Sequence, residues 1–357
     1  MICPHCEHDL LRRERTGNRC SRCSKQYALD PKTNPLRLND LRVRRITAAL
    51  TDEGRIGIVP DQLWYALSRK RIKDSTFAQG CLGMAAVVGG VAVVAAVVSE
   101  IPHPLIVTGA MLIAALVIGA ARSAGAGKGI PPVSREAFPG QVLAEWRKVY
   151  GALPPGVLDA KAPKGGRAAS GTATGTGGDT TNGVLVCPDP AVVAFLVAAG
   201  LPARYGLVPA RSPEEARAVP SGGPVLVLHD TDASGELLVR QLRDALLGRT
   251  VVDAGPPLRS VRSLPQAVAY RDPGRKPGPE QMRLLAELGT FTPEELKWLG
   301  KGWRFPLVGL PPARLLAVVD RVAAQVTRGV DADLRRAADL GFLTWPEAAG
   351  PDLVGGR

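Results

Sequence analysis

Aromatic residues and histidines are scarce in this chain of 357 residues. Phenylalanine, tryptophan and tyrosine make up only 4% of it, so alanine, valine, leucine and glycine must supply most of any core. The four histidines are scattered, which gives little support to acid–base catalysis by histidine. The sequence also lacks a Ser/His/Asp constellation and a glycine-rich loop of the kind that cradles phosphates. These absences argue against serine hydrolases and P-loop nucleotide-binding proteins.

Cysteines are few, and their spacing argues against a disulfide framework. Four of the six form two pairs near the N-terminus, Cys3 with Cys6 and Cys20 with Cys23, and the other two are isolated. Each pair can form a turn that points two thiolates at one ion, and two such turns complete a tetrahedral zinc site. This pattern predicts a structural zinc ion and a reducing compartment.

The two cysteine pairs resemble the zinc ribbon family over residues 1–35. The resemblance implies a closed site with four ligands, which braces a short chain rather than activating water. His5 and His8 are alternative ligands, and four cysteines are the favoured set. Zinc ribbons bind nucleic acid, bind proteins or serve only as a brace, so the motif predicts the metal better than the function.

Acidic residues are outnumbered: 33 aspartates and glutamates face 45 lysines and arginines, for a formal net charge of +12. Residues 1–76 carry much of this excess, including a basic segment over residues 36–76. The charge suits the phosphates of a nucleic acid or the anionic head groups of membrane lipids, and the sequence leaves both open.

Two long runs lack any charged residue, at 77–98 and 105–121. Runs of this length predict two membrane-spanning helices that form a hairpin, and the alternative is a helical hairpin buried in a soluble domain. Lysines and arginines flank the outer ends of the pair, whereas the connecting loop has none. We therefore expect a multi-pass protein of the cell's inner membrane with both termini in the cytosol.

The rest of the chain divides into a linker and a second domain. Residues 136–153 predict an amphipathic helix, and residues 160–182, rich in glycine, threonine and alanine, predict a flexible linker. From residue 183 to 265, short apolar strands alternate with helices, which favours a parallel sheet covered on both faces. Residues 266–357 read as a helical extension, in which Trp298, Trp303 and Trp345 are expected to be core residues.

One apolar strand ends in Asp230 and Asp232, with Gly235 three positions further on. With the preceding alternation, this pattern resembles the Toprim family over residues 183–265. The resemblance implies that Asp230 and Asp232 hold Mg²⁺ for phosphoryl chemistry. The family's glutamate position falls on Cys187, a poor ligand for Mg²⁺. Asp189 is a candidate for the missing carboxylate.

A structural interpretation of the acidic pair is equally open. Asp230 and Asp232 can simply end a strand, with Asp232 or Ser234 capping the next helix. Asp189 also suits a helix N-cap, and His229 can be a packed core residue.

Taken together, the sequence predicts a multidomain protein with a zinc ribbon, a two-helix transmembrane hairpin, a Toprim-like parallel sheet and a helical C-terminal region. We expect a non-catalytic regulatory or scaffolding role, with nucleic acid or a nucleotide as ligand. One alternative is a Mg²⁺-dependent nuclease or phosphotransferase that uses the acidic residues. Another is an adaptor for protein partners, in which both motifs are only structural.

Overall fold

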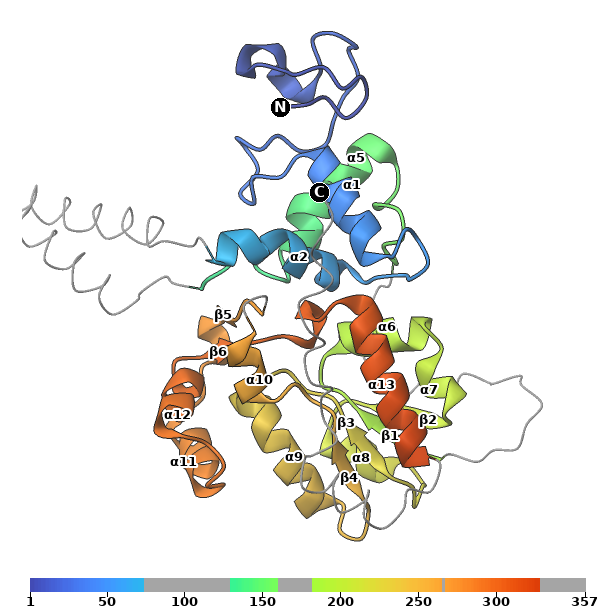
Figure 1. Ribbon diagram of the computed structural model, residues 1–357, viewed down its shortest axis with the longest axis vertical. Coiled ribbons are helices and arrows are strands. Elements are labelled where there is room, and N and C mark those ends of the chain that lie inside the picture. Colours follow the sequence, from blue (N-terminus) through green and yellow to red (C-terminus); the bar gives the residue numbers. More distant parts are fainter. Residues whose placement is uncertain (74–128, 160–181, 265–266, 328–357) are drawn as a thin grey trace, which may run out of the picture. The chain divides into compact units, whose positions relative to one another are not determined.

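The computed structural model describes residues 1–73, 129–159, 182–264 and 267–327 (Figure 1). The chain divides into two compact units, one formed by Met1–Leu67 with Val133–Arg357 and the other by Ser68–Pro132. The predicted linker at 160–182 lies outside the described residues except for its last residue. The final thirty residues, which include Trp345, lie outside them as well.

The helices and strands of the described ranges follow one another in this order along the chain. The α-helices are α1 (Asp40–Leu50), α2 (Pro60–Lys73), α5 (Ala144–Tyr150), α6 (Pro190–Ala198), α7 (Leu201–Arg204), α8 (Pro213–Ala218), α9 (Ala233–Ala245), α10 (Leu258–Ser263), α11 (Pro279–Glu287), α12 (Pro293–Gly300) and α13 (Pro312–Thr327). The strands are β1 (Gly183–Val186), β2 (Leu207–Ala210), β3 (Val225–Val227), β4 (Val251–Asp253), β5 (Tyr270–Arg271) and β6 (Trp303–Arg304). Short turns of other helical types lie at Arg12–Glu14, Thr16–Asn18, Pro139–Leu143, Pro273–Arg275 and Leu307–Gly309.

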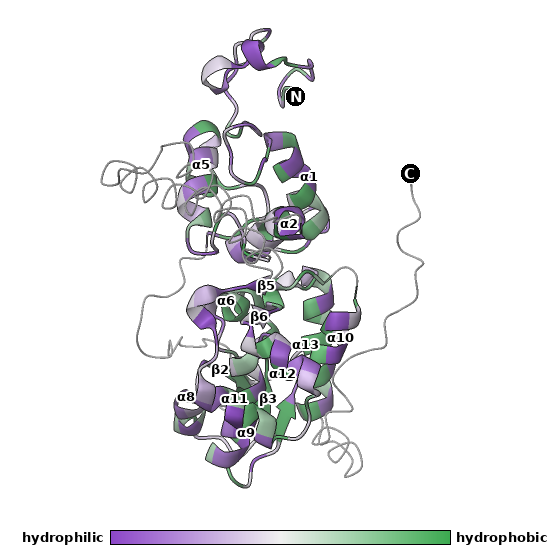
Figure 2. Ribbon diagram, turned by 90° about the vertical axis from the view of Figure 1, so that its left-hand side faces the viewer, coloured by the Kyte–Doolittle hydropathy of each residue, from purple (hydrophilic) through white to green (hydrophobic). Residues whose placement is uncertain are grey.

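The predicted parallel sheet is present. Its four strands run in the order β2-β1-β3-β4, and every pair is parallel. Alternate residues point to opposite faces, so Val184, Val225 and Val251 pack on α8 and α9 in one buried cluster. Leu185 and Leu226 face the other way and are buried as well. Helices α6 and α7 lie near this end of the sheet in Figure 1. Figure 2 shows β3 as a hydrophobic strand among helices that are partly hydrophilic.

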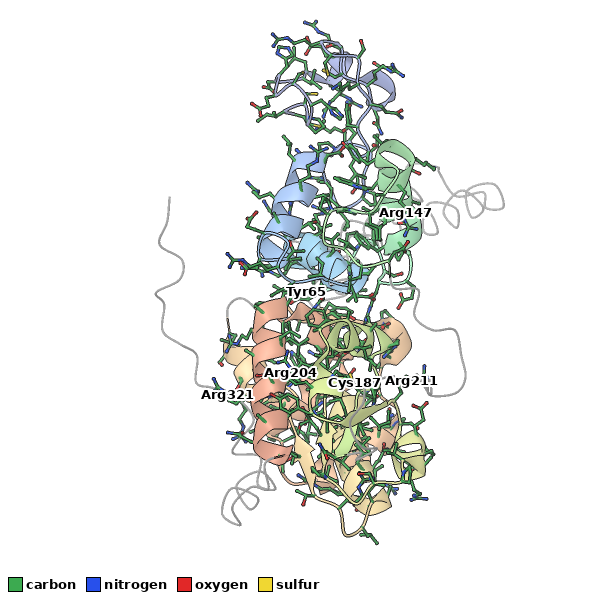
Figure 3. All side chains as sticks on the ribbon, turned by 90° about the vertical axis from the view of Figure 1, so that its right-hand side faces the viewer. Tyr65, Arg147, Cys187, Arg204, Arg211 and Arg321 are labelled. Carbon is green, nitrogen blue, oxygen red and sulfur yellow. The ribbon has the colours of Figure 1, made fainter. Side chains whose placement is uncertain are left out.

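The strand order places a ligand crevice at one point of the sheet. The chain moves from β1 outward to β2, then returns past β1 to β3 and continues to β4. The direction of winding therefore reverses between β1 and β3, and ligands of such sheets bind beyond the carboxyl ends of the strands at that reversal. Cys187 follows β1 directly and is fully buried among the layers (Figure 3).

A short antiparallel pair, β5 with β6, adds to this end of the domain. Residue Phe305, just after β6, forms a two-way backbone bridge with Thr231, with N–O distances of 3.0 and 3.1 Å. The bridge fixes the neighbouring Arg304 beside the loop that follows β3. The sequence analysis expected only helices in this region, because strands of two residues are too short for a period-two pattern.

The predicted amphipathic helix over residues 136–153 is shorter in the structure. A π-helical turn, Pro139–Leu143, leads into α5. Gly151, with a φ of 74°, caps the C-terminus of α5. Val142, Leu143 and Trp146 are buried, as the helical pattern implied. The basic segment 36–76 contains α1 and the whole of α2.

The predicted fold class and location need a correction. No helix in the described ranges is long and apolar enough to cross a membrane. Helices α13 and α2, with 16 and 14 residues, reach only about 24 and 21 Å, against a hydrocarbon core of about 30 Å. On this finding, the transmembrane hairpin and the multi-pass inner-membrane location are wrong predictions. The two runs on which they were based, 77–98 and 105–121, lie outside the described residues.

Candidate functional site

The N-terminal cysteines sit in two loops with the same backbone pattern. In the first loop the amide of Cys3 donates to the carbonyl of His8, and the amide of Glu7 donates to the carbonyl of Cys3. The second loop repeats both bonds, from Cys20 to Lys25 and from Ser24 to Cys20. Glu7 and Ser24 both have a φ of 58°, which closes each turn tightly. Each loop thus presents two sulfur atoms in the same way.

The four sulfur atoms form one compact cluster that could hold a metal ion such as zinc. All of them lie within 4.8 Å of one another. The Sγ atoms of Cys3 and Cys23 are 3.8 Å apart, as are those of Cys6 and Cys20. A tetrahedral zinc ion with bonds of about 2.3 Å requires sulfurs about 3.8 Å apart, so the cluster has the size that this ion needs.

The surroundings of the cluster act differently on its thiols. At Cys6 the backbone of His8 works to lower the pKa, but burial and the neighbouring thiols outweigh it and raise the pKa to about 11. The backbone amide of Cys23 lies 3.5 Å from the sulfur of Cys20 and lowers the pKa of that thiol to about 7. The alternative ligands are occupied elsewhere: the Nε2 atom of His5 bonds the carbonyl of Gln26, and the Nδ1 atom of His8 lies 3.4 Å from Arg22. The structure therefore favours the four-cysteine set over a set that includes either histidine.

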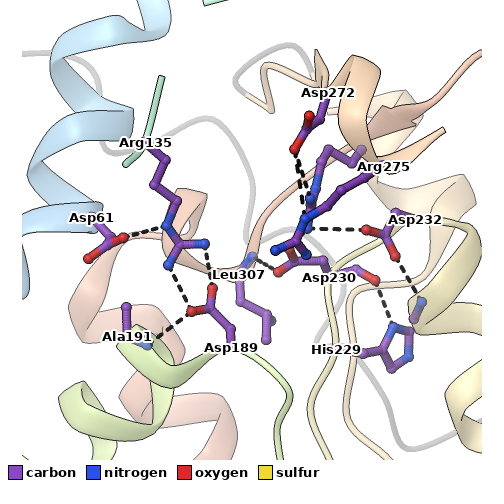
Figure 4. Close-up of polar contacts among 12 residues, drawn as sticks. Asp61, Arg135, Asp189, Ala191, His229, Asp230, Asp232, Asp272, Arg275 and Leu307 are labelled. Atoms are coloured by element: carbon purple, nitrogen blue, oxygen red, sulfur yellow. Dashed lines mark hydrogen bonds and ion pairs between the residues drawn. The ribbon is translucent and has the colours of Figure 1, made fainter. Parts of the chain in front are cut away.

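A second candidate site is a cavity of about 530 Å³ at the carboxyl ends of β1 and β3. It coincides with the reversal point of the sheet, where a ligand is expected. Three arginines and six acidic residues line it, and Figure 4 shows how most of them meet. The charged residues of its lining are Asp61, Arg135, Glu136, Asp189, Asp230, Asp232, Asp272, Arg275 and Arg304.

Asp189 is held by Arg135, which comes from the loop before α5. The two terminal nitrogens of the guanidinium donate to the two carboxylate oxygens at 2.8 and 2.7 Å, and Nε donates to Asp61 (Figure 4). Burial works against the charge of Arg135, but the two carboxylates outweigh it and raise the pKa of the guanidinium above its usual value. Asp189 also caps α6 by accepting from the amide of Ala191 at 3.0 Å. Both of its oxygens therefore have partners within the protein.

Asp230 and Asp232 are held by Arg304, whose side chain is only 5% exposed. One terminal nitrogen of Arg304 donates to Asp230 and lies 3.2 Å from Asp232. The second oxygen of Asp230 accepts from the amide of Leu307 at 2.8 Å. Asp232 caps α9 by accepting from the amide of Gly235 at 2.8 Å. Strand termination, helix capping and ion pairing thus account for these carboxylates.

Cys187 stands where the Toprim-like pattern has a glutamate, and it is fully buried. Burial raises the pKa of its thiol well above the usual value, and nearby Asp189 raises it further. A neutral thiol in this position offers no charge to a hard cation.

His229 lies beneath the acidic loop and is bonded at both ring nitrogens. Nδ1 lies 2.8 Å from the carbonyl of Asp230, and Nε2 lies 3.1 Å from Asp253. Burial disfavours the charged ring, but Asp253 prevails and raises the pKa of His229 to about 10. The imidazolium therefore donates both protons within the protein and acts as a support for the loop.

Two glycines make room for the ring of His229. A Cβ on Gly255 would lie 2.4 Å from Nε2, and one on Gly235 would lie 2.6 Å from Nδ1. Replacing Gly255 with alanine should therefore lower the free energy of unfolding by about 2–3 kcal/mol, because the ring and the backbone cannot both stay in place. Chemical denaturation measures this loss. Gly222→Ala is the matched control, since nothing lies within 4 Å of its added Cβ; equal stabilities of the two variants would contradict the expectation.

The carboxylates could be located from the sequence, but the arginines that bind them could not. Arg135 precedes Asp189 by 54 residues, and Arg304 follows Asp230 by 74. Neither arginine belongs to a motif, so no local pattern could have found them. Among the described residues, the four cysteines form the group of three or more close potential metal ligands, whereas Asp189, Asp230 and Asp232 do not form one.

Comparison of the chain with known protein families, with curated proteins and with solved structures finds no match. The functional argument therefore depends on the geometry of the cysteine cluster and of the arginine-paired carboxylates.

Proposed function

We propose that the protein is a non-catalytic nucleic-acid-binding protein with a regulatory or scaffolding role. In this proposal residues 1–35 are a zinc ribbon that contacts phosphates, and the α/β domain is a degenerate Toprim-like domain. Mg²⁺ and a free nucleotide are then not required for its activity.

The proposal that the protein is non-catalytic is supported by the pairing of the acidic residues with arginines. Metal-dependent phosphoryl transfer needs carboxylate oxygens that are free to bind a hard cation. Here the oxygens of Asp189 bind Arg135, and those of Asp230 bind Arg304 and the amide of Leu307. A cation would have to displace guanidinium groups that are 5–18% exposed. Breaking such buried ion pairs costs about 3–5 kcal/mol, which makes their displacement unfavourable.

The binding part is supported by charge around the cysteine cluster. Five cationic side chains there belong to exposed residues: Arg12, Arg13, Arg19, Arg22 and Lys25. A surface of this kind gains affinity for a polyanion by releasing counterions from the phosphates that it neutralises. The exposed charge therefore supports a nucleic acid as the partner, in preference to an uncharged protein surface.

The proposal predicts binding without turnover. The full-length protein, incubated with Mg²⁺ or Mn²⁺ and labelled DNA or RNA, should bind the strands in a salt-dependent way and leave them intact. Replacing Arg12 and Arg13 with alanine should lower the slope of log K against log salt by about 1.4–1.8, because two phosphate contacts are lost. Fluorescence anisotropy at several salt concentrations measures the slope.

The matched control is the double variant Arg211→Ala, Arg283→Ala, which removes the same charge from exposed side chains of the α/β domain. It should leave the slope unchanged. Cleavage that disappears in Asp232→Asn would instead support the Mg²⁺-dependent nuclease. No binding at low salt would favour the adaptor for protein partners.

A further inference from the structure

Two tryptophans expected in the core lie partly exposed beside one another. Trp298 of α12 and Trp303 of β6 have ring centroids 6.3 Å apart and an angle of 18° between their planes. Both residues are half-buried, whereas nearby Phe305 is 3% exposed and belongs to the interior. Trp298 packs with part of its surface against the apolar cluster that contains Leu285 and Leu299. A half-buried tryptophan still keeps part of its large aromatic surface in contact with solvent.

The strand pair β5–β6 holds a cation against this stack. Arg271 is the register partner of Trp303, and its guanidinium carbon lies 5.9 Å from the centre of the Trp303 ring. Its Nε donates to the carbonyl of Lys301 at 3.1 Å, which fixes the direction of the side chain. Stacking of this kind between a cation and an indole is pre-organised, so little ordering is needed when a ligand binds.

More positive charge surrounds the rings. Arg275, Lys276, Lys297 and Lys301 are exposed. The Cα atom of Lys276 lies 3.5 Å from the place that a Cβ on Gly302 would take, so Lys276 adjoins the residue before Trp303. Asp272, which directly follows β5, pairs with Arg275 and Arg304 at 3.8 and 3.7 Å. On α12, Glu294 and Glu295 pair with Arg262 and Arg259.

We propose that Trp298, Trp303 and Arg271, with Lys276 and Lys301 at their edge, form a stacking platform for single-stranded nucleic acid. Unpaired bases present flat faces that stack on indole and guanidinium groups, while lysines track the phosphates. In a duplex these faces are already stacked on neighbouring base pairs, so the platform discriminates against double strands. The inference builds on the proposed function and gives the α/β domain its own contact with the strand.

The test uses the full-length protein with a short oligothymidine that carries one 2-aminopurine, and with a hairpin duplex of the same length. We expect tighter binding of the single strand and quenching of the 2-aminopurine fluorescence. Replacing Trp303 with alanine should weaken single-strand binding by about 5- to 100-fold and abolish the quenching, with a smaller effect on the duplex. Trp303→Phe, which keeps an aromatic face, should retain most of both.

One further variant, a double substitution, keeps the outcome interpretable. If Trp303→Ala fails to fold, Lys276→Ala with Lys301→Ala removes only exposed side chains and should still lower single-strand affinity. The platform is refuted by equal affinity for single strand and duplex, or by unchanged single-strand affinity in these variants. Binding that depends on Arg12 and Arg13 but not on Trp303 would support the proposed function and refute the platform. No binding at all would remove both.

Discussion

Replacing Cys20 with serine should abolish retention of zinc and unfold residues 1–35. The core of this segment is small: its buried cluster contains Cys3, Leu10, Cys20 and Tyr27. Two of these four are cysteines of the sulfur cluster, so very little apolar surface remains to hold the segment without a metal. The binding free energy of a structural zinc ion, about 10–16 kcal/mol, is in such cases also the folding free energy.

The measurement is the zinc content of the purified chain, together with the protection of the N-terminal segment from proteolysis. The unaltered protein should carry about one zinc ion, and Cys20→Ser about none. Cys187→Ala is the matched control, because that thiol is buried in the α/β domain. The double variant His5→Ala, His8→Ala should keep its zinc, since both rings bond other groups. Loss of zinc in the histidine variant would overturn the four-cysteine assignment.

Replacing Arg304 with methionine should destabilise the α/β domain by about 3–5 kcal/mol. The substitution keeps most of the apolar stem but removes the guanidinium, and it leaves Asp230 buried without its ionic partner. Breaking a buried ion pair in this way leaves one charged group without a partner and without the water that solvates it in the unfolded chain. The stacked contact between Arg304 and Tyr270, at 5.7 Å, is lost as well.

Chemical denaturation gives the change in unfolding free energy. Arg283→Met is the control, because Arg283 is 68% exposed and pairs with surface glutamates of its own helix. It should cost less than about 0.5 kcal/mol. Adding Asp230→Asn to Arg304→Met should recover part of the loss, because the stranded charge is then removed. A loss below about 1 kcal/mol for Arg304→Met would show that Asp230 does not depend on it.

The parallel sheet could be predicted because its signal is local. Short apolar strands alternate with helices that begin at Pro or an N-capping residue, and the structure places Asp189 and Asp232 at such caps. The strands β5 and β6 could not be predicted, since each has two residues and exists only through its partner. The membrane prediction is contradicted on another ground: within the ranges that the structure describes, no helix is long and apolar enough to cross a bilayer.

The cysteine cluster could be read from the sequence alone, because each Cys-x-x-Cys turn holds its two sulfurs close together. The position of Asp189, Asp230 and Asp232 after apolar strands could also be read from the sequence. The structure lines one cavity with them, although they do not form a close group of potential metal ligands. Only the tertiary structure decided what those carboxylates bind. Arg135 comes from a loop and Arg304 from strand β6, each more than fifty residues from the carboxylate that it binds. The sequence around an arginine does not indicate a partner at that distance. The exposure of Trp298 and Trp303 also depends on the tertiary structure. It is set by the residues that cover each side chain and not by the residue type.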